Sequence, residues 1–232
     1  MFSIIVVVLL SYLIGAIPAS LWTGKIFFKT DIREHGSGNA GATNTFRILG
    51  WKAGTIVLLF DFGKGLLCTT VISQIAWNIG TGPVQLYSNW EVDSMIVIFA
   101  GVAAVIGHMF PVYAKFSGGK GAATACGMLY GIEPISISIS LAVFLIVMFS
   151  TRYVSLGSIA SAAIYPFSQL ILRYIYHWDI DGSIILFSSI LAVGIIVKHK
   201  GNIKRLIDGN ENRVKSFKPS AGRINQEQQE SL

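Results

Sequence analysis

We predict from the sequence an all-α integral membrane protein with seven transmembrane helices, its N-terminus outside and its C-terminus in the cytoplasm. Of the 232 residues, 53% are hydrophobic and 13% are charged, with a mean hydropathy of +0.61. Soluble domains carry about 25% charged residues. Long segments lack Asp, Glu, Lys and Arg, and the basic residues gather on one predicted face. Together these features exclude a soluble globular protein.

The charge-free segments indicate the helices in chain order, because a helix needs about 20 predominantly apolar residues to cross a bilayer. The first segment is expected to be a retained helix rather than a signal peptide, because no Lys or Arg precedes it. The second helix begins near Ala53 and includes Asp61 and Lys64, which can pair at i, i+3 spacing. The segments are 2–24, 65–90, 94–114, 121–132, 134–151, 153–172 and 182–197.

The number of crossings depends on residues 121–151. Glu133 and Pro134 divide this segment into two halves, each marginal for crossing alone. If only one half crosses, Arg152 and the basic tail lie on the opposite face from the earlier basic loops, which violates the positive-inside tendency. We therefore predict that both cross. One face then holds Lys25, Lys29, Arg33, Arg47, Lys52, Lys115, Lys120, Arg152 and the tail from Lys198 to Arg223.

No soluble domain is expected. We predict one polytopic membrane domain over residues 1–215 and a polar, disordered tail over 216–232. The net charge of +6 would suggest nucleic acid in a soluble protein, but in a membrane protein the side that carries the charge matters, so we expect no nucleic-acid partner. Cys68 and Cys126 are too few for a disulfide framework or a zinc site and are expected to pack.

The first of three unusual cytoplasmic segments covers residues 34–47. Its glycines allow positive φ and close backbone approach, so that N–H groups can surround an anion. Arg47 adds a bidentate fork suited to phosphate. A flexible turn is the alternative, but a turn does not require so many donors. The glycines and neutral donors are Gly36, Ser37, Gly38, Asn39, Gly41, Thr43 and Asn44.

The match of residues 36–41 to G-x-G-x-x-G does not indicate a dinucleotide site. No apolar strand precedes it, and the acid about 20 residues on, Asp61, lies in a predicted membrane helix. A Walker A loop is excluded as well, because Ala42 and Thr43 follow Gly41 where Lys and Ser or Thr are required.

The second segment covers residues 108–124 and ends at the start of a predicted helix. Backbone donors and the helix dipole favour an anion there, and Lys120 can supply a positive charge. His108 is either a general base or a packing residue at a helix end. Two such loops on one face suggest two phosphorylated ligands or one ligand with two phosphoryl groups. The remaining members are Gly118, Gly119, Gly121 and Thr124.

The third segment, residues 198–211, follows the last predicted helix. Its donors could contact anionic lipid headgroups, although Asn202 and Glu211 are less easily explained that way. Asp61 and Lys64 could be functional intramembrane charges or a structural pair beneath the site. The donors of this third segment are His199, Asn202, Lys204, Arg205 and Asn210.

Several chemistries are excluded by what the sequence lacks. No carboxylate cluster faces the cytoplasm as a two-metal phosphotransferase requires, so we expect no metal. No histidine is followed five residues later by aspartate. A transporter for organic phosphates is one alternative, but it usually shows an internal repeat and discontinuous helices near mid-membrane. A lipid-phosphate hydrolase is another, but no phosphoryl nucleophile is visible.

With these segments in view, the chain resembles the bacterial acyl-phosphate:glycerol-3-phosphate acyltransferases, the PlsY family. The likeness extends to about Arg213 and is carried by GSGNAGATNTFR, GHMFPVYAKFSGGKGAAT and HKGNIKRLIDGNE, with support from DFGKG at 61–65 and RYVSL at 152–156. Two departures are small: Ser117 stands where a Lys is common, and Gly201 where an acidic residue is common.

The resemblance implies transfer of a fatty acyl group from acyl phosphate to the 1-hydroxyl of glycerol 3-phosphate, at the cytoplasmic face of the bacterial inner membrane. It implies no cofactor. Membrane lipid and a peripheral enzyme that makes acyl phosphate are the candidate partners. The implied catalytic residues are Ser37, Arg47, Lys120 and His199. The implied substrate-binding residues are Gly36, Gly38, Asn39, Gly41, Thr43, Asn44, His108, Gly118, Gly119, Gly121, Thr124, Asn202 and Glu211. The structural polar residues are Asp61, Lys64, Arg152 and Ser155.

Overall fold

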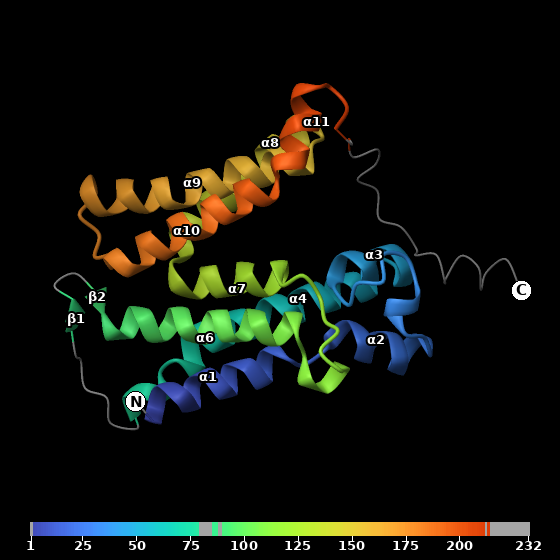
Figure 1. The fold of residues 1–232 in the computed structure, drawn as a ribbon, viewed down its shortest axis with the longest axis horizontal. Coiled ribbons are helices and arrows are strands. Elements are labelled where there is room, and N and C mark those ends of the chain that lie inside the picture. Colours follow the sequence, from blue (N-terminus) through green and yellow to red (C-terminus); the bar gives the residue numbers. More distant parts are fainter. Residues whose placement is uncertain (1, 79–84, 88–89, 212, 214–232) are drawn as a thin grey trace, which may run out of the picture. The chain divides into compact units, whose positions relative to one another are not determined.

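The computed structural model describes residues 2–78, 85–87, 90–211 and 213, and the tail predicted over 216–232 lies outside them. These residues belong to two compact units, one drawn from the ranges 1–82 and 96–132 and the other from 83–95 and 133–217. Both units consist almost entirely of helices (Figure 1).

The first charge-free segment forms two helices rather than one. Helix α1 covers Phe2–Gly15 and α2 covers Ala19–Phe28, and together they make a candidate span of 27 residues. The break falls at Pro18, which has no N–H to continue the ladder of α1. A short 3₁₀ helix, η1 (Ile32–Glu34), follows α2.

The second predicted span also departs from regular α-helix. Helix α3 (Ala42–Leu49) lies within the first polar segment, and α4 (Trp51–Leu67) continues into a π-helical turn, η2 (Cys68–Ile72), before α5 (Ile75–Asn78). In η2 the N–H of Ser73 donates to the carbonyl of Cys68 over 3.0 Å, the i to i+5 pattern of a π turn. The candidate span runs from Trp51 to Ile72.

Glycines allow helices of the first unit to pack closely against one another. Helix α6 covers Val92–Met109, a 3₁₀ turn η3 covers Val112–Ala114, and α7 covers Ala122–Ile132. A Cβ on Gly65 of α4 would overlap the Thr124 carbonyl of α7, and one on Gly127 of α7 would overlap the Phe62 carbonyl of α4. Helices in membranes pack closely through such small residues.

Substituting Gly65 by Ala should therefore destabilise the protein. The added methyl would meet the α7 backbone, and overpacking of this kind costs about 1–3 kcal/mol. Gly63 lies on the same helix with open space around its Cβ position, so Gly63→Ala should raise stability by up to about 1 kcal/mol through helix propensity. Thermal unfolding in detergent compares the two variants, and equal melting temperatures would contradict the close contact.

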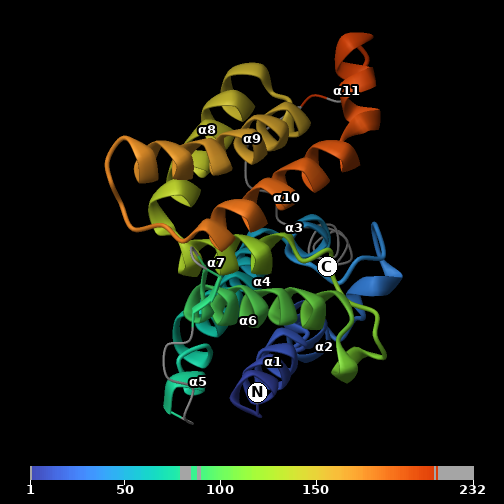
Figure 2. The same cartoon turned by 60° about the vertical axis from the view of Figure 1, so that its left-hand side comes forward.

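The second unit contains three long helices, and each packs on the next one along the chain (Figure 2). Helix α8 (Pro134–Thr151) packs on α9 (Val154–Tyr174), and α9 packs on α10 (Gly182–Lys198). A short hairpin, β1 (Gln85–Tyr87) and β2 (Trp90–Glu91), is antiparallel, with Gln85 opposite Glu91. Helix α11 (Lys200–Ile207) completes the unit.

Acidic caps explain where two of these helices begin. Glu133 accepts from the N–H groups of Ile135 and Ser136 over 3.1 and 2.6 Å, and Asp181 accepts from the N–H of Ser183 over 2.8 Å. Free N–H groups at a helix start favour such side chains. The carboxylates that interrupt the apolar segments therefore also start α8 and α10.

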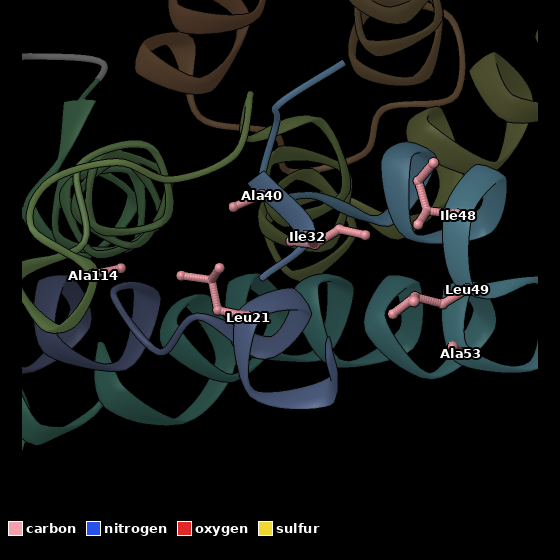
Figure 3. Close-up of a cluster of buried hydrophobic side chains, with 7 residues drawn as sticks. All are labelled: Leu21, Ile32, Ala40, Ile48, Leu49, Ala53 and Ala114. Atoms are coloured by element: carbon pink, nitrogen blue, oxygen red, sulfur yellow. The ribbon is translucent and has the colours of Figure 1, made fainter. Parts of the chain in front are cut away.

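A buried apolar cluster lies around the first polar segment (Figure 3). Its members come from α2, η1, the loop that follows η1, α3, α4 and η3. Burial of these side chains fixes loops that would otherwise have only hydrogen bonds to hold them. They are Leu21, Ile32, Ala40, Ile48, Leu49, Ala53 and Ala114.

The prediction of a helical membrane fold is confirmed. Among the described residues, five helices are long and apolar enough to cross a membrane, or six if α10 and α11 form one span with a 54° bend. Helix α7 has 11 residues, which extend about 17 Å at 1.5 Å per residue. The seven crossings stay a prediction.

Candidate functional site

Asn44 holds the first polar segment in shape. Its buried side chain accepts from the N–H of Ser37 and donates to the carbonyls of Ile32 and His35, each over 3.0 Å. Gly36 is left-handed, with φ of +63°, and a Cβ there would overlap Asn44 Oδ1. The structure thus places Asn44 as the scaffold of the loop, although the sequence predicted it as a substrate contact.

Other predicted donors of this segment are open to solvent. Ser37, Thr43 and Arg47 are exposed and Asn39 is partly exposed. Thr43 and Arg47 lie four residues apart on α3, so they share one face of that helix. Gly41 immediately precedes α3. The first segment therefore presents a hydroxyl in the first turn of α3 and a guanidinium in its last turn, on one face of the helix.

Asp31 and Arg33, just before this segment, connect it to η3. Asp31 accepts from Arg33 Nη2 over 2.7 Å, and Arg33 Nη1 donates to the carbonyl of Ala114 over 3.2 Å. The hydrogen bonds and positive charge of Arg33 hold the pKa of Asp31 well below its usual range, and they outweigh the opposing effect of desolvation.

This pair predicts a dependence of stability on pH. A carboxylate whose pKa is depressed by folding stabilises the protein above its unfolded pKa of about 3.9, and the stabilisation disappears as the pH falls through the lower folded value. Asp31→Asn should therefore lower the melting temperature at pH 7, and its difference from wild type should shrink below about pH 4. Thermal unfolding at pH 7 and pH 3 measures this. A difference that is the same at both pH values would contradict the prediction.

The second segment adjoins the first. The N–H of Gly119 donates to the carbonyl of His108 over 3.2 Å. A Cβ built on Gly41 would lie 3.9 Å from Gly119 Cα, and one on Gly119 would meet the carbonyl of Ala40. The two glycine loops predicted on one face are therefore in contact within one unit.

The remaining residues of the second segment differ in exposure. Lys120 is exposed, Gly118 and Gly119 are partly exposed, and Gly121 is left-handed with φ of +80°. Thr124 is fully buried where α7 packs on α4, so the structure places it in the helix interface although the sequence predicted a substrate contact.

The charges predicted to pair in the second span do pair. Lys64 Nζ lies 2.9 Å from Asp61 Oδ1 and donates to the carbonyl of Ile17 over 3.1 Å. His108 Nδ1 lies 3.3 Å from the same Asp61 oxygen. Sequence reasoning missed this third member, because His108 is 47 residues from Asp61 and no local pattern joins them.

In the second unit, Glu211 organises the third polar segment. Its Oε1 accepts from Ser155 Oγ over 2.9 Å and from Asn202 Nδ2 over 2.8 Å, and its Oε2 accepts from Arg205 Nε over 2.7 Å. The hydrogen bond from Asn202, followed by those from Ser155 and Arg205, lowers the pKa of Glu211. Glu211 is thus held ionised by its partners.

A pocket of about 380 Å³ opens beside this network. His199 Nδ1 lies 2.9 Å from the carbonyl of Ile195 and therefore carries the proton, which leaves Nε2 as an acceptor when the ring is neutral. Arg213 Nε donates to Tyr153 Oη over 2.8 Å. The sequence did not single out Arg213, Tyr153 or Ser158. The lining residues are Val154, Ser155, Ser158, His199, Asn202, Glu211 and Arg213.

Arg152 lies outside this pocket. It is exposed and ends α8 in a left-handed conformation, with φ of +63°, and its N–H donates to the carbonyl of Met148 over 2.8 Å. Its role in the described structure is therefore that of a helix terminus.

A helical membrane fold whose glycine loops offer many hydrogen-bond donors is typical of integral membrane proteins that bind anionic ligands. The family model described as glycerol-3-phosphate acyltransferase matches residues 5–209. The chain belongs to this family of membrane acyltransferases.

Close relatives and solved structures agree with this assignment. The glycerol-3-phosphate acyltransferase of Salinibacter ruber is 44% identical over 97% of this chain and 98% of its own, and that of Chlorobaculum tepidum is 41% identical over 92% and 97%. The crystal structure of PlsY, an integral membrane glycerol 3-phosphate acyltransferase, in its glycerol 3-phosphate form has a TM-score of 0.68 at 32% identity, covering 91% of this chain and 96% of that one. The lysophosphatidic acid form has a TM-score of 0.66 at 30% identity, covering 96% and 98%.

Proposed function

We propose that this acyltransferase uses acyl phosphate as its donor and acylates the sn-1 hydroxyl of glycerol 3-phosphate. The products are lysophosphatidic acid and inorganic phosphate, and the reaction is the first step of bacterial phospholipid synthesis. The contact between the two glycine loops, at Gly41 and Gly119, is the observation that carries this proposal. Each substrate has one phosphate, and each segment offers backbone donors and an exposed cation, Arg47 in the first and Lys120 in the second.

The chemistry requires little beyond binding and charge stabilisation. The acceptor hydroxyl oxygen attacks the acyl carbonyl carbon, the bond from that carbon to the phosphate oxygen breaks, and phosphate leaves with the electron pair. Acyl phosphate is already activated, so holding the two substrates together supplies much of the rate. Cationic donors stabilise the departing phosphate. Because no nucleophile of the enzyme is needed, the transfer is direct.

The proposed phosphate ligands are the predicted donors whose side chains are accessible to solvent. In the loops, Ser37, Asn39, Arg47 and Lys120 are at least partly exposed and can donate to phosphate oxygens. In the pocket beside α11, His199 and Asn202 are the proposed phosphate ligands. The backbone of Gly36, Gly38, Gly118 and Gly121 shapes the two loops.

In this direct transfer, a substrate phosphate is the proposed acceptor of the hydroxyl proton. The alternative acceptor is His199, because its Nε2 is unprotonated in the neutral ring. His199→Gln discriminates between them in single-turnover experiments: if His199 is the general base, the chemical step is lost while binding of glycerol 3-phosphate is retained. An acyl adduct trapped on Ser37 would contradict direct transfer altogether.

The test of the function uses purified protein, labelled glycerol 3-phosphate and palmitoyl phosphate, without metal or coenzyme A. We expect labelled lysophosphatidic acid and an equal amount of phosphate. A parallel reaction with palmitoyl-coenzyme A identifies the donor. Lysophosphatidic acid formed only from the thioester would contradict the proposed donor, and phosphate release without acylation would indicate a hydrolase.

We also propose seven crossings, with the N-terminus outside and the loops on the cytoplasmic side of the inner membrane. Support comes from the charge distribution and from the apolar helix α7, which adds a short crossing to the longer candidate spans. Cysteine-accessibility labelling at position 120, with position 177 as the opposite side, tests this arrangement. A peripheral enzyme that synthesises acyl phosphate is the proposed partner.

A further inference from the structure

A buried polar network lies under the second glycine loop. Asp61, Lys64 and His108 are 2%, 4% and 7% exposed. Asp61 Oδ1 lies 2.9 Å from Lys64 Nζ and 3.3 Å from His108 Nδ1. Burying charges is costly unless they are paired, and a purely structural pair of Asp61 and Lys64 would have no need of the imidazole.

The opposite edge of the His108 ring faces the loop. A Cβ added to Gly119 would overlap Nε2 and Cε1 of His108. The backbone makes a second contact, because the N–H of Gly119 donates to the carbonyl of His108 over 3.2 Å. His108 therefore touches Gly119 with both its ring and its main chain.

Asp61 and Gly119 contact opposite edges of the ring. Nδ1 lies 3.3 Å from the Asp61 carboxylate, which also pairs with Lys64, and the edge with Nε2 and Cε1 faces Gly119. A ring that turned away from this orientation would lose its contacts with both.

We propose that His108 is a positioning residue that sets the conformation of the donor-phosphate loop at Gly119, and that Asp61 and Lys64 act through it by fixing its ring. The proposal rests on the proposed function, in which this loop holds the phosphate of the acyl donor. His108 itself need not touch the substrate.

The first test is a double-mutant cycle between His108 and Gly119. Asn at 108 keeps an amide donor for Asp61 but removes the ring edge beside Gly119. We expect His108→Asn to raise KM for palmitoyl phosphate about tenfold, with KM for glycerol 3-phosphate and kcat within about threefold of wild type. Gly119→Ala should raise the same KM, and by less in the His108→Asn background, because the methyl no longer overlaps the ring, although it still meets the Ala40 carbonyl.

Controls separate positioning from a general loss of structure. His177 is exposed and left-handed, with φ of +58°, and Asn tolerates that conformation, so His177→Asn should leave both KM values unchanged. Equal rises in both KM values, or effects of His108→Asn and Gly119→Ala that simply multiply, would overturn the proposal.

A second pair of variants tests Asp61 without leaving a buried charge unpaired. Asp61→Asn with Lys64→Met keeps a polar oxygen beside His108 Nδ1, whereas Asp61→Leu with Lys64→Met removes it. We expect KM for palmitoyl phosphate to be about tenfold higher in the Leu pair, and equal values would overturn the role of Asp61.

A measurement that does not depend on enzyme activity distinguishes a failure of the positioning role from a failure of the proposed function. If wild type does not use palmitoyl phosphate, the proposed function fails, while the same cycle measured by thermal unfolding still tests the contact of His108 with Gly119. Additive shifts in melting temperature would then overturn the positioning role, and coupled shifts would support it.

Discussion

Arg47→Ala should raise KM for glycerol 3-phosphate by about 10- to 100-fold, as expected when a charge-assisted phosphate contact worth about 1.5–3 kcal/mol is lost. Arg47 is exposed on the face of α3 that also carries Thr43. Its side chain has no structural partner to lose in the described contacts, so the fold should be retained. Steady-state kinetics with varied acceptor measures the effect.

Two further variants test whether the effect is specific to position 47 and whether it depends on the planar guanidinium. Lys52→Ala removes an exposed cation one helix later and should leave the acceptor KM near that of wild type. Arg47→Lys keeps the charge but loses the planar fork, so its KM should lie between those of wild type and Arg47→Ala. Unchanged kinetics in Arg47→Ala would remove Arg47 from the site.

Glu211→Ala should lower kcat/KM by about 100-fold, the scale expected when binding groups shift by about 1 Å. The substitution removes the acceptor shared by Ser155 and Asn202 and the partner of Arg205. Asn202 lines the pocket beside α11 and would lose the contact that orients it. The measurement is initial rate against each substrate, with circular dichroism to confirm helix content.

Glu211→Gln is the matched control. Its amide oxygen can still accept from Ser155 and Asn202, while the charge opposite Arg205 is lost, so activity should fall much less than in Glu211→Ala. Because its partners lower the pKa of Glu211, the carboxylate stays ionised to a lower pH than a free glutamate would, and the network weakens only as the pH falls through that lower range. A similar loss in both variants would show that charge, and not hydrogen bonding, is what matters.

The long apolar segments could be predicted because hydropathy and charge act locally. The segment 134–151 coincides with α8, since Glu133 and Pro134 mark its start both in composition and in capping. The break at Pro18 divides a segment that hydropathy alone reads as one helix. The π turn at 68–72 has no comparable sequence signal.

For the candidate site, the sequence predicted which types of residue take part but not the role of each residue. Composition identified Asn44 and Thr124 as donors, but packing buries both, and in the folded chain Asn44 bonds to the backbone of its own loop. The pairing of Asp61 with Lys64 follows from helical spacing, whereas the approach of His108 depends on how α6 lies against α4. Local rules do not specify such tertiary contacts.

Lys64 joins two features that a sequence comparison would treat as unrelated. Its ammonium neutralises Asp61 and also donates to the Ile17 carbonyl, at the point where α1 ends before Pro18. The Lys64 ammonium thus pairs with a charge in its own helix and satisfies a carbonyl at the break between α1 and α2. Among homologous chains, substitutions at positions 17–18, 61 and 64 should consequently co-vary, and a sequence that loses the acid while keeping the proline should still retain a hydrogen-bond donor at position 64.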